Sequence, residues 1–349
     1  MSDALRVHDA PRCNDVPEDP LAFLEGLEGA SAWHVAGRDR SRTRVVTTLL
    51  HGNEPSGFLA MHAWLRSGVV PAVDAICVVA NVEAARLHPI FTHRSVPGRR
   101  DLNRCFGDPR DTEGVDPEAR IAHAILDLID HQRPEAVVDL HNNTGRNPAY
   151  AIGLDPSREA LALAARFGRH FVWSHLRLGA LLEAVSSCPA VTVEVGKSGD
   201  DAADRIARAG LSALLETESL FEPLDRGVEV RILRMPMRAR MRPGRRLVMA
   251  QALDPSAHLT MPDDLDRHNF EVVPAGARVG WVGPAEADCP LELIDEAGRD
   301  RAADYFERQH DALVARRPFM PIMITMDAAI ATSDCLFYVV HDVRQSSSE

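Results

Sequence analysis

The stretch Val45-Val46-Thr47-Thr48-Leu49-Leu50-His51-Gly52-Asn53-Glu54-Pro55-Ser56-Gly57 decides the fold, because it joins an apolar run to a polar turn. Its β-branched first half is typical of a buried strand, and its glycine and proline mark a turn. Residues 58–65 continue it as an amphipathic, helix-like stretch. His51 and Glu54 lie three residues apart in the turn. A neutral imidazole and a carboxylate are zinc ligands, and a catalytic zinc site needs a third protein ligand and an open position.

Short apolar runs alternate with longer amphipathic stretches up to about residue 224. The predicted strands are residues 45–50, 75–80, 136–140 and 190–195. The predicted helices are residues 55–66, 117–131, 158–167, 180–186 and 201–215. Strand–helix alternation of this kind predicts an α/β fold with a largely parallel sheet flanked by helices.

The pattern changes after about residue 224, where short strand-like runs are separated by Pro, Gly and Asp. These runs are residues 228–233, 246–252, 277–282 and 336–341, and residues 300–316 are predicted to form a helix. We therefore predict an α/β catalytic domain over residues 1–225 and a smaller, mainly β domain over residues 226–349. Residues 1–30 are acidic and Pro-rich, and we expect a loosely ordered lead-in there.

Composition limits the classes of partner. The net charge of −12 argues against nucleic acid and against an anionic membrane surface. The six cysteines are scattered without a CxxC pair, so free thiols in a reducing compartment are expected. No apolar run reaches the roughly 18 residues of a membrane helix, and the first residues carry no apolar signal core, so the expected location is cytoplasmic. The sequence leaves open whether the chain forms a homo-oligomer.

His141 is the candidate for the third ligand, because it follows the predicted strand 136–140 as His51 follows 45–50. In open α/β sheets, ligands collect beyond the carboxyl ends of strands. His51, Glu54 and His141 would then form a metal site with an open position, and Asp139 would hydrogen-bond a ligand imidazole. The alternative is that these are ordinary packed residues among fifteen histidines. The coincidence of ligand types with two strand ends favours the metal site.

Glu194 is the candidate general base, since it stands near the end of the apolar strand 190–195. A carboxylate is costly to bury unless it is paired or used. It could cap a neighbouring turn, or it could take a proton from a water molecule at the metal and pass it on.

Residues 92–106 form a basic cluster in an acidic chain and are the candidate substrate clamp. A guanidinium holds a carboxylate through a planar fork of donors. Arg104 and Asn103 are favoured because they follow Asp101 and Leu102, whereas a solvated basic loop is the alternative for the other arginines.

Together these motifs resemble the succinylglutamate desuccinylase/aspartoacylase family, which is related to zinc carboxypeptidases. The matching segments are HGNEPSG at 51–57, DLNR at 101–104, DLHN at 139–142 and EVG at 194–196. They occur in the family's order and span roughly residues 45–200. The combination is specific, although any one tetrapeptide alone would be weak.

The resemblance implies one Zn²⁺ per chain, bound by His51, Glu54 and His141, with Glu194 as general acid and base. It also implies that Asn103 and Arg104 hold a carboxylate of a small N-acyl amino acid. The implied fold is a zinc-carboxypeptidase-like mixed sheet, followed by a smaller β-rich domain that narrows the active-site entrance.

Departures from the family pattern leave the substrate open. Arg94, Arg99 and Arg100 compete for the role of an arginine upstream of DLNR, and Arg94 is favoured. Asn143 or Arg146 could lie at the substrate. Ala184 stands where aspartoacylase has an arginine, and Tyr305 and Tyr338 both compete for a C-terminal substrate contact. The rival functions are a zinc carboxypeptidase acting on short peptides and a non-catalytic metal- or ligand-binding relative.

Overall fold

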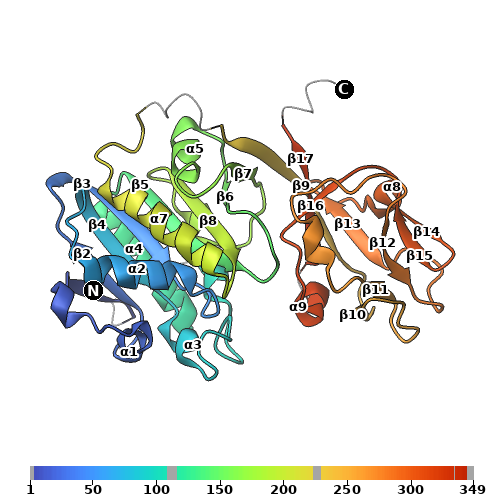
Figure 1. Cartoon of the computed structure of the whole chain (residues 1–349), viewed down its shortest axis with the longest axis horizontal. Coiled ribbons are helices and arrows are strands. Elements are labelled where there is room, and N and C mark those ends of the chain that lie inside the picture. The colour runs from blue at the N-terminus through green and yellow to red at the C-terminus, as the bar shows by residue number, and fades with distance from the viewer. Residues whose placement is uncertain (1–3, 108–115, 223–228, 334, 344–349) are drawn as a thin grey trace. The chain divides into compact units, whose positions relative to one another are not determined.

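The structure is a computed structural model that describes residues 4–107, 116–222, 229–333 and 335–343 (Figure 1). The chain divides into two compact units. The first contains Met1–Asn142, Ala149–Phe171 and Arg177–Arg231. The second contains Ile232–Glu349 together with the short segments Asn143–Pro148 and Val172–Leu176. The expected boundary near residue 225 lies outside the described residues.

A mixed sheet forms the centre of the first unit. Its strand order is β1 (Arg6–Asp9), β2 (Ser31–Val35), β4 (Val73–Val79), β3 (Asp39–Thr48), β5 (Ala136–Asn143), β8 (Ala190–Lys197), β6 (Tyr150–Gly153) and β7 (His170–Trp173). The four predicted strand runs of this unit overlap β3, β4, β5 and β8, and the runs 45–50 and 75–80 extend one or two residues beyond the ends of β3 and β4. β3 is parallel to both β4 and β5, whereas β2 runs antiparallel to β4 and β6 antiparallel to β8.

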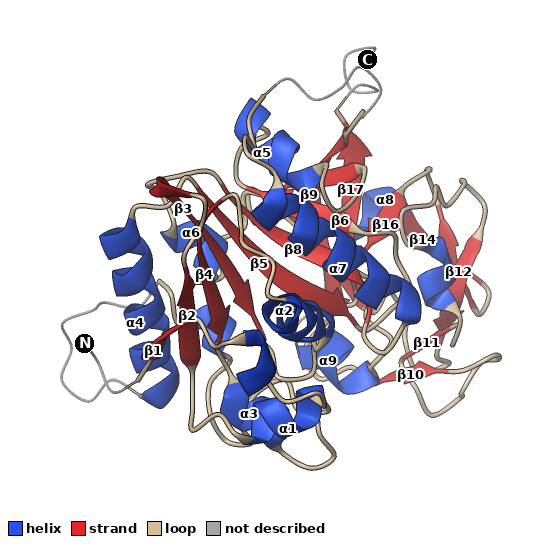
Figure 2. Ribbon diagram, turned by 60° about the vertical axis from the view of Figure 1, so that its left-hand side comes forward, coloured by secondary structure: helices blue, strands red, loops and turns tan. Residues whose placement is uncertain are grey.

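Helices cover both faces of this sheet (Figure 2). They are α1 (Pro20–Glu25), α2 (Ser56–Ser67), α3 (Val82–Arg86), α4 (Pro117–Gln132), α5 (Arg158–Ala164), α6 (Leu181–Ala184) and α7 (Asp201–Glu216), with short 3₁₀ turns η1 (Cys13–Asp15) and η2 (Leu102–Arg104). The predicted helices correspond to α2, α4, α5, α6 and α7. The start of α4 shows why the sequence specifies it, because Pro117 is pre-organised for a first turn and Asp116 accepts the Ala119 N–H at 2.8 Å.

Successive side chains along each strand point to opposite faces of the sheet, so each layer of helices packs on its own set of side chains. Val45, Ile76 and Val137 project toward α4, where Ile125 and Ile129 complete one apolar cluster. α2 packs on the opposite face, so closely that a Cβ on Gly57 would meet the Leu140 Cβ at 2.7 Å. This close packing of Gly57 on Leu140 holds the start of α2 directly over the ends of β3 and β5.

The N-terminal segment is more regular than its composition indicates. Residues 6–25 contain β1, η1 and α1 instead of a loosely ordered lead-in. β1 pairs in parallel with β2 at the edge of the sheet, and Phe23 of α1 is buried against the ring of Trp33. The pairing of β1 with β2 and the contact between Phe23 and Trp33 order a segment that is otherwise polar.

The second unit is mainly β. Four of its strands pair in the order β13 (Leu291–Asp295), β9 (Arg231–Met241), β17 (Phe337–Asp342) and β16 (Met320–Ile322). A separate sheet has the order β10 (Leu247–Met249), β11 (Leu259–Met261), β12 (Arg278–Val282), β15 (Ala312–Ala315) and β14 (Phe306–Gln309). η3 (Leu265–His268), α8 (Ala302–Tyr305) and α9 (Ala328–Ser333) complete it. The predicted runs 246–252, 277–282 and 336–341 overlap β10, β12 and β17, and 228–233 overlaps β9, although residue 228 lies outside the described part of the chain.

The helix predicted over residues 300–316 is wrong. Only Ala302–Tyr305 is helical, after which β14 and β15 form an antiparallel pair that matches Phe306 with Ala315. The chain reverses at His310, whose φ of 60° lies in the left-handed region. Leu313 and Ala315 are buried on one side of β15. This spacing of two residues is that of a strand and not of the helix expected from the sequence.

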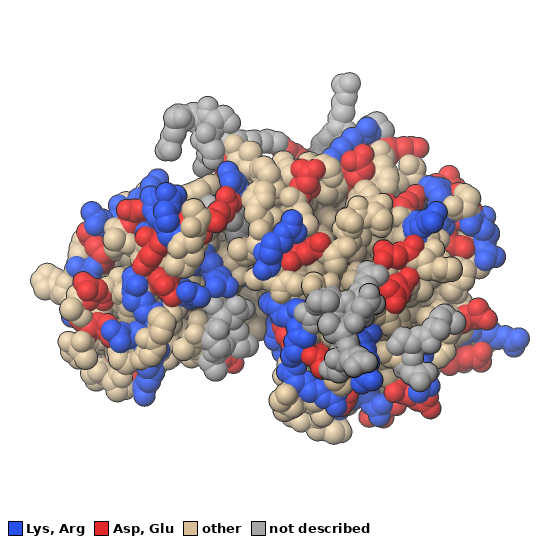
Figure 3. All heavy atoms as spheres, turned by 180° about the vertical axis from the view of Figure 1, so that it is seen from behind, with Lys and Arg blue, Asp and Glu red and all other residues tan. Residues whose placement is uncertain are grey.

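Surface charge is mixed in sign on the face shown in Figure 3. In the second unit, for example, Arg240 pairs across the strands with Glu292 at 2.7 Å. Among the described helices, none is both long and apolar enough to cross a membrane.

Candidate active site

The connection between β3 and α2 carries His51 and Glu54. β3 ends at Thr48 and α2 begins at Ser56, so both side chains sit on a short turn at the carboxyl end of the strand. Gly52 allows this turn to pack closely, because a Cβ there would meet the Ala85 N at 2.5 Å and the His93 O at 2.7 Å. A larger residue would push the turn away from its neighbours.

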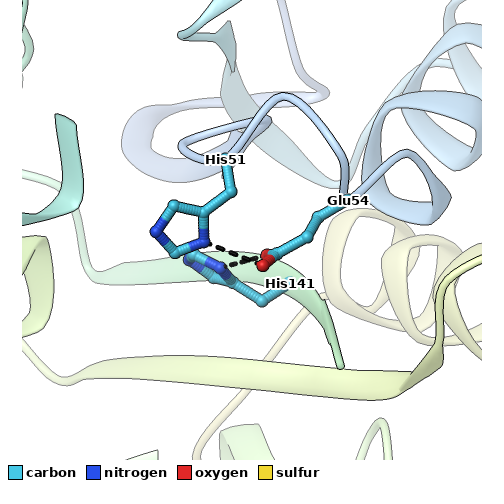
Figure 4. Close-up of side chains that lie close together, drawn as sticks. All are labelled: His51, Glu54 and His141. Carbon is cyan, nitrogen blue, oxygen red and sulfur yellow. Dashed lines mark hydrogen bonds and ion pairs between the residues drawn. The ribbon is translucent and has the colours of Figure 1, made fainter. Parts of the chain in front are cut away.

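His141 reaches the same point from β5. Thr48, the last residue of β3, pairs with Leu140 in the parallel ladder, so His141, near the end of β5, lies level with the end of β3. His51 Nδ1 lies 2.9 Å from Glu54 Oε1, and His141 Nδ1 lies 2.6 Å from Glu54 Oε2 (Figure 4). One ligand atom from each of these buried residues lies within 4.8 Å of the other two. The structure therefore brings together all three predicted metal ligands.

A second carboxylate orients each imidazole from its other nitrogen. Asp101 Oδ1 lies 3.1 Å from His51 Nε2, and Asp139 Oδ2 lies 2.6 Å from His141 Nε2. The Thr47 hydroxyl donates to Asp139 Oδ1 at 2.6 Å and holds that carboxylate in place. Asp139 was predicted as such a partner; the matching role of Asp101 was not. The one available signal was that DLNR and DLHN both begin with aspartate.

The electrostatics of the group follow from this mutual pairing. Burial would raise the pKa of Glu54, but the two facing imidazoles hold that pKa well below its usual range. Burial would lower the pKa of His141, whereas the carboxylates of Asp139 and Glu54 raise it well above its ordinary value. For Asp101, the effect of burial is outweighed by His51 and by nearby arginines, and its pKa is lowered.

Glu194 lies on the strand next to His141. β8 neighbours β5 in the sheet, and the Val137 N–H donates to the Pro189 carbonyl at 3.0 Å. Val137 and Ala190 both contact the apolar cluster beneath α4. His141 and Glu194 each follow four residues later, so alternation places them on that same face of the sheet. Glu194 is itself buried.

Arg94 is the upstream arginine that reaches Glu54, one of the three candidate metal ligands. Its Nη1 lies 3.6 Å from Glu54 Oε1, and its Nε donates to Asp101 Oδ2 at 2.9 Å. Arg99 instead pairs with Glu83 at 2.6 Å, and Arg100 pairs with Asp116 at 3.0 Å. The structure therefore separates the three competing arginines by what they contact.

Asn103 and Arg104 lie on the 3₁₀ turn η2, which Asp101 begins by accepting the Asn103 N–H at 2.9 Å. The Asn103 side-chain oxygen accepts the Leu181 N–H at 3.0 Å and so ties η2 to the start of α6. Arg104 is half-buried, and its Nη1 donates to the Asn103 carbonyl at 2.8 Å.

Gly179 brings the turn before α6 up against η2. Its φ of +80° and a projected Cβ only 2.5 Å from the Arg104 carbonyl require glycine there. η2 is thus packed against the chain on the side of α6.

The three buried groups fit a divalent cation. Two imidazole nitrogens facing one carboxylate form a donor set that zinc accepts. A carboxylate on the far nitrogen of each ligand imidazole is the usual outer partner in zinc sites, where it fixes ring orientation and raises basicity.

The catalytic-domain profile of the succinylglutamate desuccinylase/aspartoacylase family matches residues 41–216, about half of the chain. The chain belongs to this family. The matched region contains all three metal-ligand candidates, Glu194 and the η2 turn. No curated protein matches the chain in sequence.

Solved structures share the fold at low sequence identity. A succinylglutamate desuccinylase from Chromobacterium violaceum has a TM-score of 0.60 at 16% identity, covering 94% of this chain and 99% of that one. A succinylglutamate desuccinylase/aspartoacylase from Rhodobacter sphaeroides has a TM-score of 0.57 at 19% identity, covering 88% of each chain. Murine aminoacylase 3 has a TM-score of 0.55 at 19% identity, covering 88% of this chain and 97% of that one.

Asn143 and Arg146 belong to the segment grouped with the second unit. Within that unit Asn269 holds the segment, because its side chain donates to the Arg146 carbonyl at 2.6 Å and accepts the Ile324 N–H at 3.0 Å. A substrate contact by either Asn143 or Arg146 stays a prediction.

Proposed function

We propose that this protein is a zinc-dependent amidohydrolase that cleaves the amide bond of a small N-acyl amino acid. The observation that carries the proposal is the convergence of His51, Glu54 and His141 at the carboxyl ends of two parallel strands. Membership of a deacylase family supports the reaction class. The same ligand set at strand ends also supports the inferred kinship with the zinc-carboxypeptidase fold.

His51, Glu54 and His141 would hold the zinc ion. When bound, zinc would act as a Lewis acid that polarises the amide carbonyl and lowers the pKa of water. Asp101 and Asp139 keep the two imidazoles oriented toward it through hydrogen bonds to their far nitrogens.

Glu194 is the proposed general base and acid. It accepts a proton from the attacking water molecule and then donates that proton to the leaving amine, so that one carboxylate serves both halves of the reaction. Its place on the strand beside His141, on the same face of the sheet, supports this role.

Asn103 and Arg104 are the proposed clamp for the substrate carboxylate. The side-chain oxygen of Asn103 is already bonded to the Leu181 N–H, so its amide NH₂ group is the donor that it offers. Arg104 adds a guanidinium fork from the next position. Arg94, which lies beside Glu54, would stabilise negative charge that develops on the carbonyl oxygen.

Free-amine release from a panel of N-acyl amino acids tests this function. The panel varies the acyl group (formyl, acetyl, succinyl and longer chains) and the amino acid (acidic, neutral and basic), and it includes short N-blocked peptides. Zinc-loaded protein should release amine from one acyl-amino-acid class, and a chelator should abolish the release. Activity on the peptides alone would identify a carboxypeptidase, and zinc binding without turnover on any amide would contradict an enzymatic role.

A further inference from the structure

We propose that Asn142 is a positioning residue that fixes the ligand carboxylate of Glu54 relative to the end of β8, the strand that carries Glu194. The proposal rests on the proposed function, because it concerns the geometry of the same site. It assigns a role to the residue that follows His141, which otherwise has none.

The backbone N–H and both polar side-chain atoms of Asn142 bond to the turn at Glu54, the start of α2 and β8. Its backbone N–H donates to Glu54 Oε2 at 3.3 Å. Its side-chain Oδ1 accepts the Ser56 N–H at 3.0 Å, at the start of α2. Its Nδ2 donates to Ser56 Oγ at 2.9 Å and to the Gly196 carbonyl at 3.2 Å. The residue is buried, so no solvent competes for these bonds.

The bond to Gly196 connects the metal turn to β8. Gly196 lies two residues after Glu194, and its φ of 128° belongs to the region that favours glycine. Ser198 adds a second connection, because its hydroxyl donates to the Asn53 carbonyl at 2.9 Å. The segment that follows Glu194 is therefore bonded to Asn53, directly before Glu54, and to Asn142, which itself donates to Glu54.

Ser56 extends this arrangement to a helix. Its hydroxyl donates to Asp204 Oδ1 at 2.6 Å, in the first turn of α7. The Ser56 hydroxyl, which accepts the hydrogen bond from Asn142 Nδ2, is thus held in one orientation. Buried polar groups that satisfy one another in this way hold a single arrangement.

The chemistry needs such a connection. The proposed base and the metal ligands come from separate strands, and a proton can pass only over hydrogen-bond distances. Asn142 touches neither substrate nor metal in this scheme and acts through Glu54 and the backbone of β8. Its loss should weaken zinc binding and slow the chemical step, while KM, which reports the clamp, should hold.

The test compares Asn142→Ala with Asn81→Ala. Asn81 is a matched control because it is also buried, and its side chain caps α3 by accepting the Ala84 N–H at 3.2 Å. Zinc affinity is measured without substrate, by competition with a chromophoric chelator, and kcat, KM and the melting temperature are measured on zinc-loaded protein.

Asn142→Ala keeps the backbone N–H that donates to Glu54 but removes the side-chain bonds to Ser56 and Gly196 that hold it in place. We therefore expect Asn142→Ala to weaken zinc binding about tenfold, the low end of the effect of losing an outer partner of a metal ligand. Its kcat should fall with KM unchanged, and Asn81→Ala should keep wild-type zinc affinity.

Equal zinc affinity in wild type and Asn142→Ala would overturn the proposal, as would equal losses in Asn142→Ala and Asn81→Ala. If Asn142→Ala does not fold, Ser56→Ala removes only the hydroxyl that accepts the amide, and it should still weaken zinc binding severalfold. No effect in this variant would overturn the proposal as well. A wild-type protein that binds zinc but cleaves no amide would contradict the proposed function and leave the affinity comparison decisive for Asn142. A wild-type protein that binds no zinc would refute both.

Discussion

Glu194 and Arg104 have proposed roles that predict different kinetic behaviour. Glu194 should act on a proton, whereas Arg104 should act on the substrate carboxylate. Neither belongs to the metal-ligand group. Zinc content should therefore stay at the wild-type level when either is changed, and only turnover or substrate affinity should respond.

Glu194→Gln should reduce kcat by about 10²–10⁴-fold, the usual contribution of general acid–base catalysis. The amide keeps the size of the carboxylate but cannot accept the proton. Glu118→Gln is the control, because Glu118 is equally buried on α4 and no role in the reaction is proposed for it. Steady-state kinetics beside zinc analysis checks the prediction, and near-normal turnover in Glu194→Gln would remove Glu194 from the mechanism.

Arg104→Ala should lower kcat/KM at least tenfold. A hydrogen bond to a charged group contributes about 1.5–3 kcal/mol, and its loss should appear mainly as a higher KM. Arg99→Ala is the matched control, since Arg99 belongs to the same basic cluster but pairs with Glu83 and Glu118. If both variants show the same kinetics, Arg104 does not bind the substrate.

The candidate metal site could be predicted because His51 and His141 follow apolar runs directly. Parallel strands bring their carboxyl ends to one edge, so sequence order alone places His51 and His141 together. The contact between Asp101 and His51 could not be predicted in this way, because the two residues are 50 positions apart with α2, β4 and α3 between them, and Asp101 directly follows no strand. Asn142 shows the same limit, since its bonds depend on how β5, β8 and α2 pack.

At the scale of elements, the clearest wrong prediction is the helix over residues 300–316, where the chain forms paired strands instead. Residues 306–315 have a composition that also suits a helix, yet they form β14 and β15, because their apolar side chains complete the core of the second unit. Local propensity is a weak prior when tertiary burial favours the other conformation. In the α/β part, the four predicted strands could be found because each contains a continuous apolar run, whereas β1, β2, β6 and β7 were not predicted.

Arg44 provides a stability prediction at this scale, because it joins β3 to the end of α7. It is fully buried, its Nε lies 2.6 Å from Glu135 Oε1, and its Nη1 donates to the Leu214 and Thr217 carbonyls at 2.6 and 2.7 Å. Burial lowers the pKa of this guanidinium, and Glu135 opposes that shift. Arg44→Ala would remove this donor from the helix-end carbonyls and would leave Glu135 paired with the more exposed Arg42.

We expect Arg44→Ala to reduce the free energy of unfolding by about 3–5 kcal/mol, as for a broken buried ion pair. Arg42→Ala is the control: Arg42 lies on the same strand and also pairs with Glu135, but its side chain is 37% exposed. An exposed pair contributes about 0–1 kcal/mol. Urea unfolding of the two variants measures the difference, and equal losses would show that the buried bonds to α7 add nothing.

At the scale of the whole molecule, all three proposed zinc ligands belong to one of the two units. His51, Glu54 and His141 lie in the first unit. A ligand that binds only folded protein stabilises it by about 2.7 kcal/mol when its free concentration is 100 times its Kd. Zinc should therefore stabilise the first unit and leave the second unit's own stability unchanged.

Removing zinc with a chelator should lower the melting temperature of the first unit by several degrees without unfolding it. The metal-free group remains paired internally, because both imidazoles lie within hydrogen-bond distance of the Glu54 carboxylate. Differential scanning calorimetry of zinc-loaded and chelated protein measures the shift. Fluorescence of variants that retain a single tryptophan assigns it to a unit, because Trp33 and Trp64 report the first unit and Trp281 the second.

His51→Ala is the control for this experiment, since its melting should no longer respond to zinc. A shift of equal size in that variant would mean that zinc binds elsewhere on the chain. A zinc effect confined to Trp281 would place the stabilised region in the second unit. Either result would contradict a metal site built from the ends of β3 and β5, whereas loss of the shift in His51→Ala would assign the stabilisation to that site before any substrate is known.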